Sequence, residues 1–195
     1  VQARHSCWSS DLYAGDPVSC LEHATAGYSM YDREKHRSHK FLYGTHDPGV
    51  CGLNHKGLTN VILGHADEAS RYVEEAVELA KDLAHPTTMV MAYMFATMSH
   101  HFRGDAEAAG RYATEGIALC DEFRIPGWGA GIEATLGWAQ FKQGAGAESI
   151  AQLIAGMNRW RSEGNMVYWP WFLTLRAEAE MYLGNHDEAL AIVSD

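Results

Sequence analysis

A glycine that returns every 40 residues is the feature that most restricts how this chain can fold. It lies between two helix-like apolar segments at four positions: Gly64, Gly104, Gly144 and Gly184. The surrounding residues are alike, with LGHADEA at 63–69, RGDAEAA at 103–109 and LGNHDEA at 183–189. Repetition at a fixed spacing is typical of architectures in which small helical units stack on their neighbours. We therefore predict an all-α chain of paired helices.

The turn in each unit has a physical explanation. Glycine can take the left-handed conformation that closes a helix, and a following Asp105 or Asn185 can cap the next one. The same turn occurs at Gly15-Asp16-Pro17, where Asp16 is the expected N-cap and Pro17 the first helical residue. These turns, together with prolines that end helices, predict one helical-repeat domain over 1–195. The domain would contain five units, at about 1–31, 48–84, 86–124, 126–164 and 166–195. A long His-rich loop at about 32–47 would separate the first unit from the second.

Small residues recur at fixed distances from the turn glycine, and in this the chain resembles the tetratricopeptide (TPR) repeat. They stand seven before it (Gly57, Thr97, Gly137, Ala177), five after it (Ala69, Ala109, Ser149, Ala189) and twelve after it (Gly27, Ala76, Gly116, Gly156). The resemblance implies a right-handed α-α superhelix. Two departures are a period of 40 instead of about 34 residues and Trp8 at the small position of the first unit. HEAT-type repeats share the longer period but lack this register.

A narrower resemblance concerns the segment from Tyr31 to Cys51, together with His85-Pro86 and His101-Phe102-Arg103. It is similar to helical-repeat regions of large bacterial signalling ATPases, many of them fused to nucleotide cyclase domains. The resemblance implies a regulatory or sensor region of a multidomain protein. Because the chain begins without methionine and ends within an expected helix, we expect it to be an excerpt of a larger protein.

Composition argues against several classes of function. The formal net charge of −10 disfavours nucleic acid and anionic membranes as partners. The cysteines Cys7, Cys20, Cys51 and Cys120 show no C-x-x-C spacing, which fits reduced thiols in a cytoplasmic protein. There is no apolar run of bilayer length and no complete catalytic motif, so we expect neither a membrane protein nor an enzyme, and no cofactor. A cysteine-based enzyme using Cys51 with His46 or His55 is a minor alternative.

The TPR resemblance implies that the first helix of each unit lines a concave groove. Transferred to this sequence, the groove residues are unusually apolar and aromatic. They include His5, Ser9, Leu12, Cys51, Asn54, Leu58, Met91, Met94, Met98, His101, Trp138, Phe141 and Trp171. Such a surface suits an apolar helix, a hydrophobic peptide or a small amphipathic molecule. The alternative is that the methionine stripe is core, because helical periodicity does not distinguish the two.

The loop at 32–47 is long enough to fold back over the groove, and loops of this length are often functional. Tyr43, His46 and Asp47 would then meet His5 and Asn54. Asp47 also has the structural role of N-cap before Pro48. A zinc site from His5, His46, Cys51 and His55 is a further alternative, but the spacing matches no zinc signature, and the prediction is no metal.

These observations favour a non-catalytic module that binds a protein partner, or attached domains of its parent chain, within a signalling protein. The alternative is a sensor that holds a small amphipathic molecule in the groove beneath the His-rich loop. A covered groove would favour the sensor and an open apolar groove the interaction module. Fold alone does not decide between them.

Overall fold

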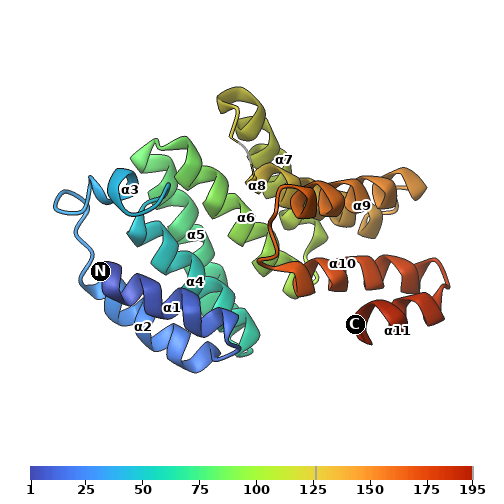
Figure 1. Ribbon diagram of the computed structural model, residues 1–195, viewed down its shortest axis with the longest axis horizontal. Helices are drawn as coiled ribbons and strands as arrows, with labels where there is room; N and C mark the ends of the chain where they lie inside the picture. The colour runs from blue at the N-terminus through green and yellow to red at the C-terminus, as the bar shows by residue number, and fades with distance from the viewer. Residues whose placement is uncertain (126, 195) are drawn as a thin grey trace. The chain divides into compact units, whose positions relative to one another are not determined.

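A computed structural model of the chain describes residues 1–125 and 127–194. All regular secondary structure in these residues is helical, which confirms the all-α prediction. The helices form two compact units, Val1–Gly104 and Asp105–Asp195. Figure 1 shows that most helices of each unit are arranged as antiparallel pairs joined by short turns. No helix among the described residues combines the length and apolar character that crossing a membrane requires.

The first unit is built around one central helix. Its elements are α1 (Gln2–Tyr13), α2 (Pro17–Ser29), α3 (His39–Leu42), α4 (Pro48–Ile62), α5 (Ala66–Leu83) and α6 (Pro86–Phe102). α4 packs against α1, α2, α5 and α6, and every residue from Pro48 to Asn60 is buried. A helix surrounded in this way has no solvent-facing stripe, which explains why its sequence shows little amphipathic pattern. Its buried polar side chains find partners within the unit, as where Asn60 Nδ2 donates to the Lys56 carbonyl and Lys56 Nζ lies over the Tyr72 ring. The His-rich segment before it contains the short helix α3.

The second unit repeats the pairing. It consists of α7 (Ala106–Phe123), α8 (Trp128–Lys142), α9 (Ala147–Ser162), α10 (Trp169–Tyr182) and α11 (His186–Ser194). α8 packs against both α7 and α9, and α10 packs against α11. In Figure 1 the pairs α8–α9 and α10–α11 run side by side within this unit.

The turn glycines adopt the predicted conformation. All have φ between +70° and +92°: Gly15, Gly64, Gly104, Gly144 and Gly184. The side chain of Asp16 accepts a hydrogen bond from the Ser19 N–H, and that of Asp105 accepts one from the Ala108 N–H. These two predicted N-caps are therefore confirmed. Each cap satisfies a backbone donor that the first turn of a helix leaves unpaired. The side-chain amide of Asn185, also a predicted N-cap, donates a hydrogen bond to Glu180 Oε2 at 2.9 Å.

The small residues permit close contact between paired helices. A Cβ atom on Gly137 of α8 would lie 2.5 Å from the backbone nitrogen of Leu153 and 2.6 Å from the carbonyl oxygen of Ser149. One on Gly156 of α9 would lie 2.5 Å from the backbone nitrogen of Ala134. Because the atoms in the way belong to backbone, no side-chain rotation can relieve the contact. Glycine at both positions is thus required by the spacing of α8 and α9.

We expect Gly137→Ala to lower the free energy of unfolding by roughly 1–3 kcal/mol, because the helices must separate to admit the methyl group. Chemical denaturation measures this change. Gly110→Ala is the matched control, since its Cβ would meet mainly the flexible Gln143 amide at 3.2 Å. Alanine is the better helix former, so this control should be neutral or stabilising. Equal losses in the two variants would contradict the close-contact explanation.

The first helix pair uses a different arrangement, as the departure at Trp8 suggested. Trp8 is fully buried, with 0% of its surface exposed. Its ring lies directly over Gly27 of α2, where a Cβ would overlap the indole. Trp8 stands where the first helix of the other pairs has a small residue, whereas α2 keeps the small residue Gly27, which leaves room for the indole. The indole also stacks on His5, with ring centroids 5.0 Å apart.

Candidate functional site

Most of the residues that the sequence analysis assigned to a groove are buried. Half-buried members are His5, Ser9, Leu12 and His46, and Tyr43 is exposed. The buried members are Asp47, Cys51, Asn54, Leu58, Met91, Met94, Met98, His101, Trp138, Phe141 and Trp171. A partner would reach these buried side chains only if their helices moved apart. The residues have further roles within their own units, as in the hydrogen bond of 3.0 Å from Trp138 Nε1 to Glu178 Oε2.

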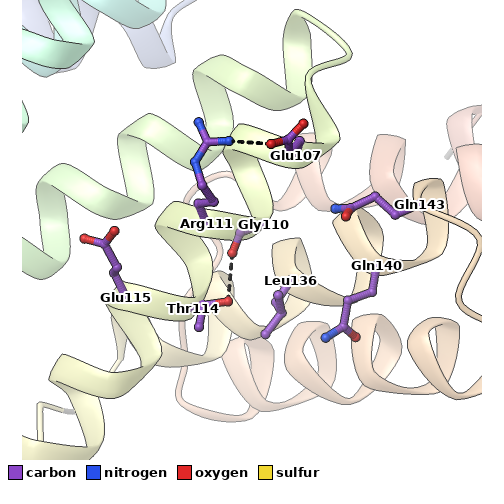
Figure 2. A pocket seen from close by; sticks show the side chains of 8 residues that line it. All are labelled: Glu107, Gly110, Arg111, Thr114, Glu115, Leu136, Gln140 and Gln143. Atoms are coloured by element: carbon purple, nitrogen blue, oxygen red, sulfur yellow. Dashed lines mark hydrogen bonds and ion pairs between the residues drawn. The ribbon is translucent and has the colours of Figure 1, made fainter.

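An open hollow lies between α7 and α8 of the second unit. Its volume is about 460 Å³ and it is lined from both helices: Glu107, Gly110, Arg111, Thr114 and Glu115 on α7, and Leu136 and Gln140 on α8, with Gln143 next to it. Figure 2 shows the side chains of Gln140 and Gln143 on one side of the hollow and that of Arg111 on the other. Leu136 lies between them and provides an apolar contact.

Polar groups of this hollow are partly engaged with the protein itself. Arg111 forms an ion pair with Glu107 at 3.1 Å, and Thr114 donates a hydrogen bond to the Gly110 carbonyl (Figure 2). Gln143 Nε2 donates to the Ala106 carbonyl at 3.0 Å.

In contrast, the amide of Gln140 makes no hydrogen bond within the described part of the chain. Two glutamates and one arginine give the lining a negative balance. Sequence reasoning missed this hollow. The available signal was Gln140 and Gln143, two amides three residues apart at the end of a largely apolar helix.

A cluster of histidine and cysteine side chains forms a second candidate site, in the first unit. His5 comes from α1, His46 from the loop before α4, and Cys51 from the first turn of α4. His46 Nε2 lies 3.4 Å from His5 Nε2, and Cys51 Sγ lies 3.3 Å from the same His5 nitrogen. One ligand atom from each residue lies within 4.8 Å of the other two.

A fourth residue, His55, lies one turn further along α4. Its Nδ1 is 3.6 Å from Cys51 Sγ but donates a hydrogen bond of 2.8 Å to the Cys51 carbonyl. Burial lowers the pKa of His55 to about 4, and burial next to His5 lowers that of His46 to about 4. Burial also raises the pKa of the Cys51 thiol to about 12. At neutral pH the imidazoles are therefore neutral and the thiol is protonated.

The His-rich loop makes only one of the predicted contacts across to α1, that of His46 with His5. Tyr43 is 63% exposed and its ring packs edge-on against His39 instead. Asp47 is the N-cap of α4, as predicted. Its Oδ1 accepts hydrogen bonds from the backbone N–H groups of Gly49 and Val50, and its Oδ2 accepts one from the Tyr31 hydroxyl.

Comparisons with known proteins identify the fold. No protein-family model matches the chain. A curated relative, an uncharacterized protein of Rhizobium meliloti (strain 1021), is 20% identical over all 195 residues, and the chain spans 19% of that relative's length. A crystal structure of nearly identical TPR-like repeats, described as a kinesin light chain of Podosopora anserina, is similar with a TM-score of 0.61 and 12% identity. The similarity covers 99% of this chain and 91% of that one, and a second crystal structure, of a substituted form of the same repeats, gives the same values.

These similarities confirm that the chain has a TPR-like helical-repeat fold. The match extends over nearly the whole chain, as the repeated glycine and small residues predicted. The identity is too low for the likeness to carry more than the fold.

Proposed function

We propose that this TPR-like chain is a non-catalytic protein-interaction module and that it binds an extended peptide in the hollow between α7 and α8. Surface hollows between helices of a repeat are natural sites for a peptide, because they offer side chains from two elements at once. The observation that carries the proposal is Gln140, whose amide faces the open hollow without a partner among the described residues.

The chemistry of the lining indicates what kind of peptide would fit. An extended chain presents both N–H and C=O groups, and a glutamine amide can accept from one and donate to the other. Glu107 and Glu115 outnumber Arg111 in the lining, so a basic residue in the peptide would be favoured. Leu136 would contact an apolar side chain. The expected partner is therefore an extended segment with a basic residue near an apolar one.

The setting of this module is a longer regulatory protein. The chain spans 19% of the length of its curated relative, which leaves room in that relative for further domains. The resemblance of the segment from Tyr31 to Cys51 to repeat regions of bacterial signalling ATPases supports a signalling role, and the unpaired cysteines suit the cytoplasm. The bound peptide would then belong either to another protein or to another part of the parent chain.

Photocrosslinking from the hollow tests the proposal. With a photoreactive phenylalanine derivative at position 140 of the full-length protein, irradiation in cells should give a crosslink to a defined peptide segment, identified by mass spectrometry. The control places the same residue at Glu122, an exposed position on α7 that does not line the hollow. We expect no crosslink, or a much weaker one, from the control position.

Equal crosslinking from both positions, or none from position 140, would overturn the peptide site. If position 140 gave no crosslink and native mass spectrometry showed a retained small molecule lost on denaturation, the sensor function would replace it. In that case the ligand would have to enter between helices, because the predicted groove residues Met91, Met94, Met98, His101 and Asn54 are buried.

A further inference from the structure

Three side chains suited to bind a transition metal converge from parts of the first unit that are distant in sequence. His5, His46 and Cys51 come from α1, a loop and α4. His5 Nε2 contacts both His46 Nε2 and Cys51 Sγ, and a ligand atom of His46 lies within 4.8 Å of one of Cys51. From this geometry we propose that His5, His46 and Cys51 bind a Zn²⁺ ion, with the fourth position of a tetrahedral site left to water.

The distances agree with this coordination. Zinc binds imidazole nitrogen at about 2.0–2.1 Å and thiolate sulfur at about 2.3 Å, so adjacent ligand atoms of a tetrahedral site are about 3.3–3.6 Å apart. The observed separations are 3.4 Å between the two Nε2 atoms and 3.3 Å between Cys51 Sγ and His5 Nε2. The remaining pair of ligand atoms, those of His46 and Cys51, lies within 4.8 Å. A rotation of the His46 imidazole, which is half-buried at the end of the loop, would shorten this distance to that of a tetrahedral site.

A neighbouring amide prepares His5 as a ligand. Gln2 Oε1 lies 3.1 Å from His5 Nδ1, and Gln2 Nε2 lies 3.1 Å from His39 Nδ1. If the Gln2 amide donates to His39, its oxygen accepts the Nδ1 proton of His5, which leaves the lone pair on His5 Nε2. Such a second partner fixes the tautomer and orientation of a metal-binding imidazole. The nitrogen with the lone pair is the one that faces Cys51 and His46.

Metal binding has a simple proton balance. Both imidazoles bind as neutral groups and release no proton. The Cys51 thiol gives up its proton to solvent as the S–Zn bond forms, so one proton is released for each ion bound. Burial raises the pKa of the free Cys51 thiol to about 12 because it disfavours the charged thiolate. A bound cation compensates the thiolate charge and so removes this unfavourable effect of burial.

Nearby groups are less suited to be the fourth ligand. His55 and Asp47 are not among the residues whose ligand atoms converge in this cluster. The Nδ1 of His55 is engaged with the Cys51 carbonyl, and both oxygens of Asp47 accept hydrogen bonds from Gly49, Val50 or Tyr31. Solvent reaches the site on the side of the half-buried His5 and His46. The ion would hold the His-rich loop against α1 and α4, and so couple the position of the loop to metal availability.

Cobalt substitution tests this site on the full chain. After treatment with chelator, the protein is titrated with Co²⁺, which should bind one equivalent and give a thiolate-to-cobalt charge-transfer band together with the visible bands of a tetrahedral ion. Zn²⁺ should then displace the cobalt and abolish both signals. A ratio near one is expected because the described residues provide one such cluster.

Three variants assign the signals to their ligands. Cys51→Ser should abolish the charge-transfer band, and His46→Asn should weaken Co²⁺ and Zn²⁺ binding at least tenfold. Cys20→Ser is the matched control, because Cys20 is also a buried thiol on a helix but pairs with the Thr59 hydroxyl at 3.3 Å. This control should bind as the parent does. His46 lies on the loop, so its variant is informative even if Cys51→Ser does not fold.

Several results would overturn the proposal: no stoichiometric cobalt binding by the parent, or a charge-transfer band that survives in Cys51→Ser. Loss of that band in Cys20→Ser would assign it to another thiol and would be equally decisive. Unchanged affinity in His46→Asn would show that the loop does not contribute a ligand. The peptide site in the second unit is independent of all these outcomes.

Discussion

Replacement of Trp138 by alanine is expected to lower the free energy of unfolding by about 3–5 kcal/mol, as for other fully buried aromatic residues. Only 1% of the Trp138 side chain is exposed. The substitution leaves a cavity beside α8 and also removes the indole donor of the hydrogen bond to Glu178 on α10, at 3.0 Å. The Glu178 side chain is 39% exposed and lies 3.7 Å from Lys142 Nζ, so water and the lysine can replace the lost donor and the cavity accounts for most of the cost.

Urea denaturation followed by circular dichroism measures this change, with Trp138→Phe as the conservative control. Phenylalanine fills most of the space but cannot donate to Glu178, so we expect a smaller loss. Met94→Ala, at another fully buried groove position, should cost about 2–5 kcal/mol for the same reason. Near-parental stability in both alanine variants would mean that these side chains are not core and would restore the open apolar groove.

Acidification of the metal-free protein is expected to destabilise it between pH 6.5 and 4. Burial lowers the pKa of His55 from its ordinary value of 6.5 to about 4. Below pH 6.5 the unfolded chain binds a proton at this residue while the folded protein does not, so stability falls as the pH falls. The contribution is complete above pH 6.5 and is lost as the pH reaches the folded-state value. It amounts to about 3 kcal/mol for this group.

The measurement is the urea midpoint as a function of pH in the presence of a chelator. The groups near the His55 ring are Trp8, Phe95, His5, His46 and Cys51, and none of them carries a negative charge at neutral pH that would stabilise a protonated imidazole. His55→Leu removes the contribution of this residue and should make the profile less steep over this range, while His46, whose pKa burial also lowers to about 4, continues to contribute. A profile equally steep in parent and variant would assign the acid sensitivity to other residues.

Repetition made much of the fold predictable. A glycine at a turn, a carboxylate after it and small residues at fixed distances are local requirements of a tight helical hairpin, so each is visible in the sequence. Asp16 and Asp105 cap their helices as predicted, and Gly137 and Gly156 stand where α8 and α9 approach most closely. The irregular first pair was visible at Trp8 and the small residue Gly27 was recognised, but the packing of the indole on Gly27 was not predicted.

The candidate sites were less predictable, because they depend on residues brought together from different helices. His46 and His5 were named as possible neighbours, but their distance from Cys51 follows from the path of the loop before α4. The hollow beside Gln140 depends on how far α7 stands from α8, which no single helix determines.

The sequence by itself determined the helical pairs, their turns and their close contacts, since these arise from neighbours within one repeat. Only the tertiary structure decided which apolar stripe is exposed. Met91, Met94, Met98 and Trp138 have the periodicity of a groove and of a core alike, and the structure buries them. The physical reason is that periodicity records which residues share a helical face, whereas burial depends on what packs against that face.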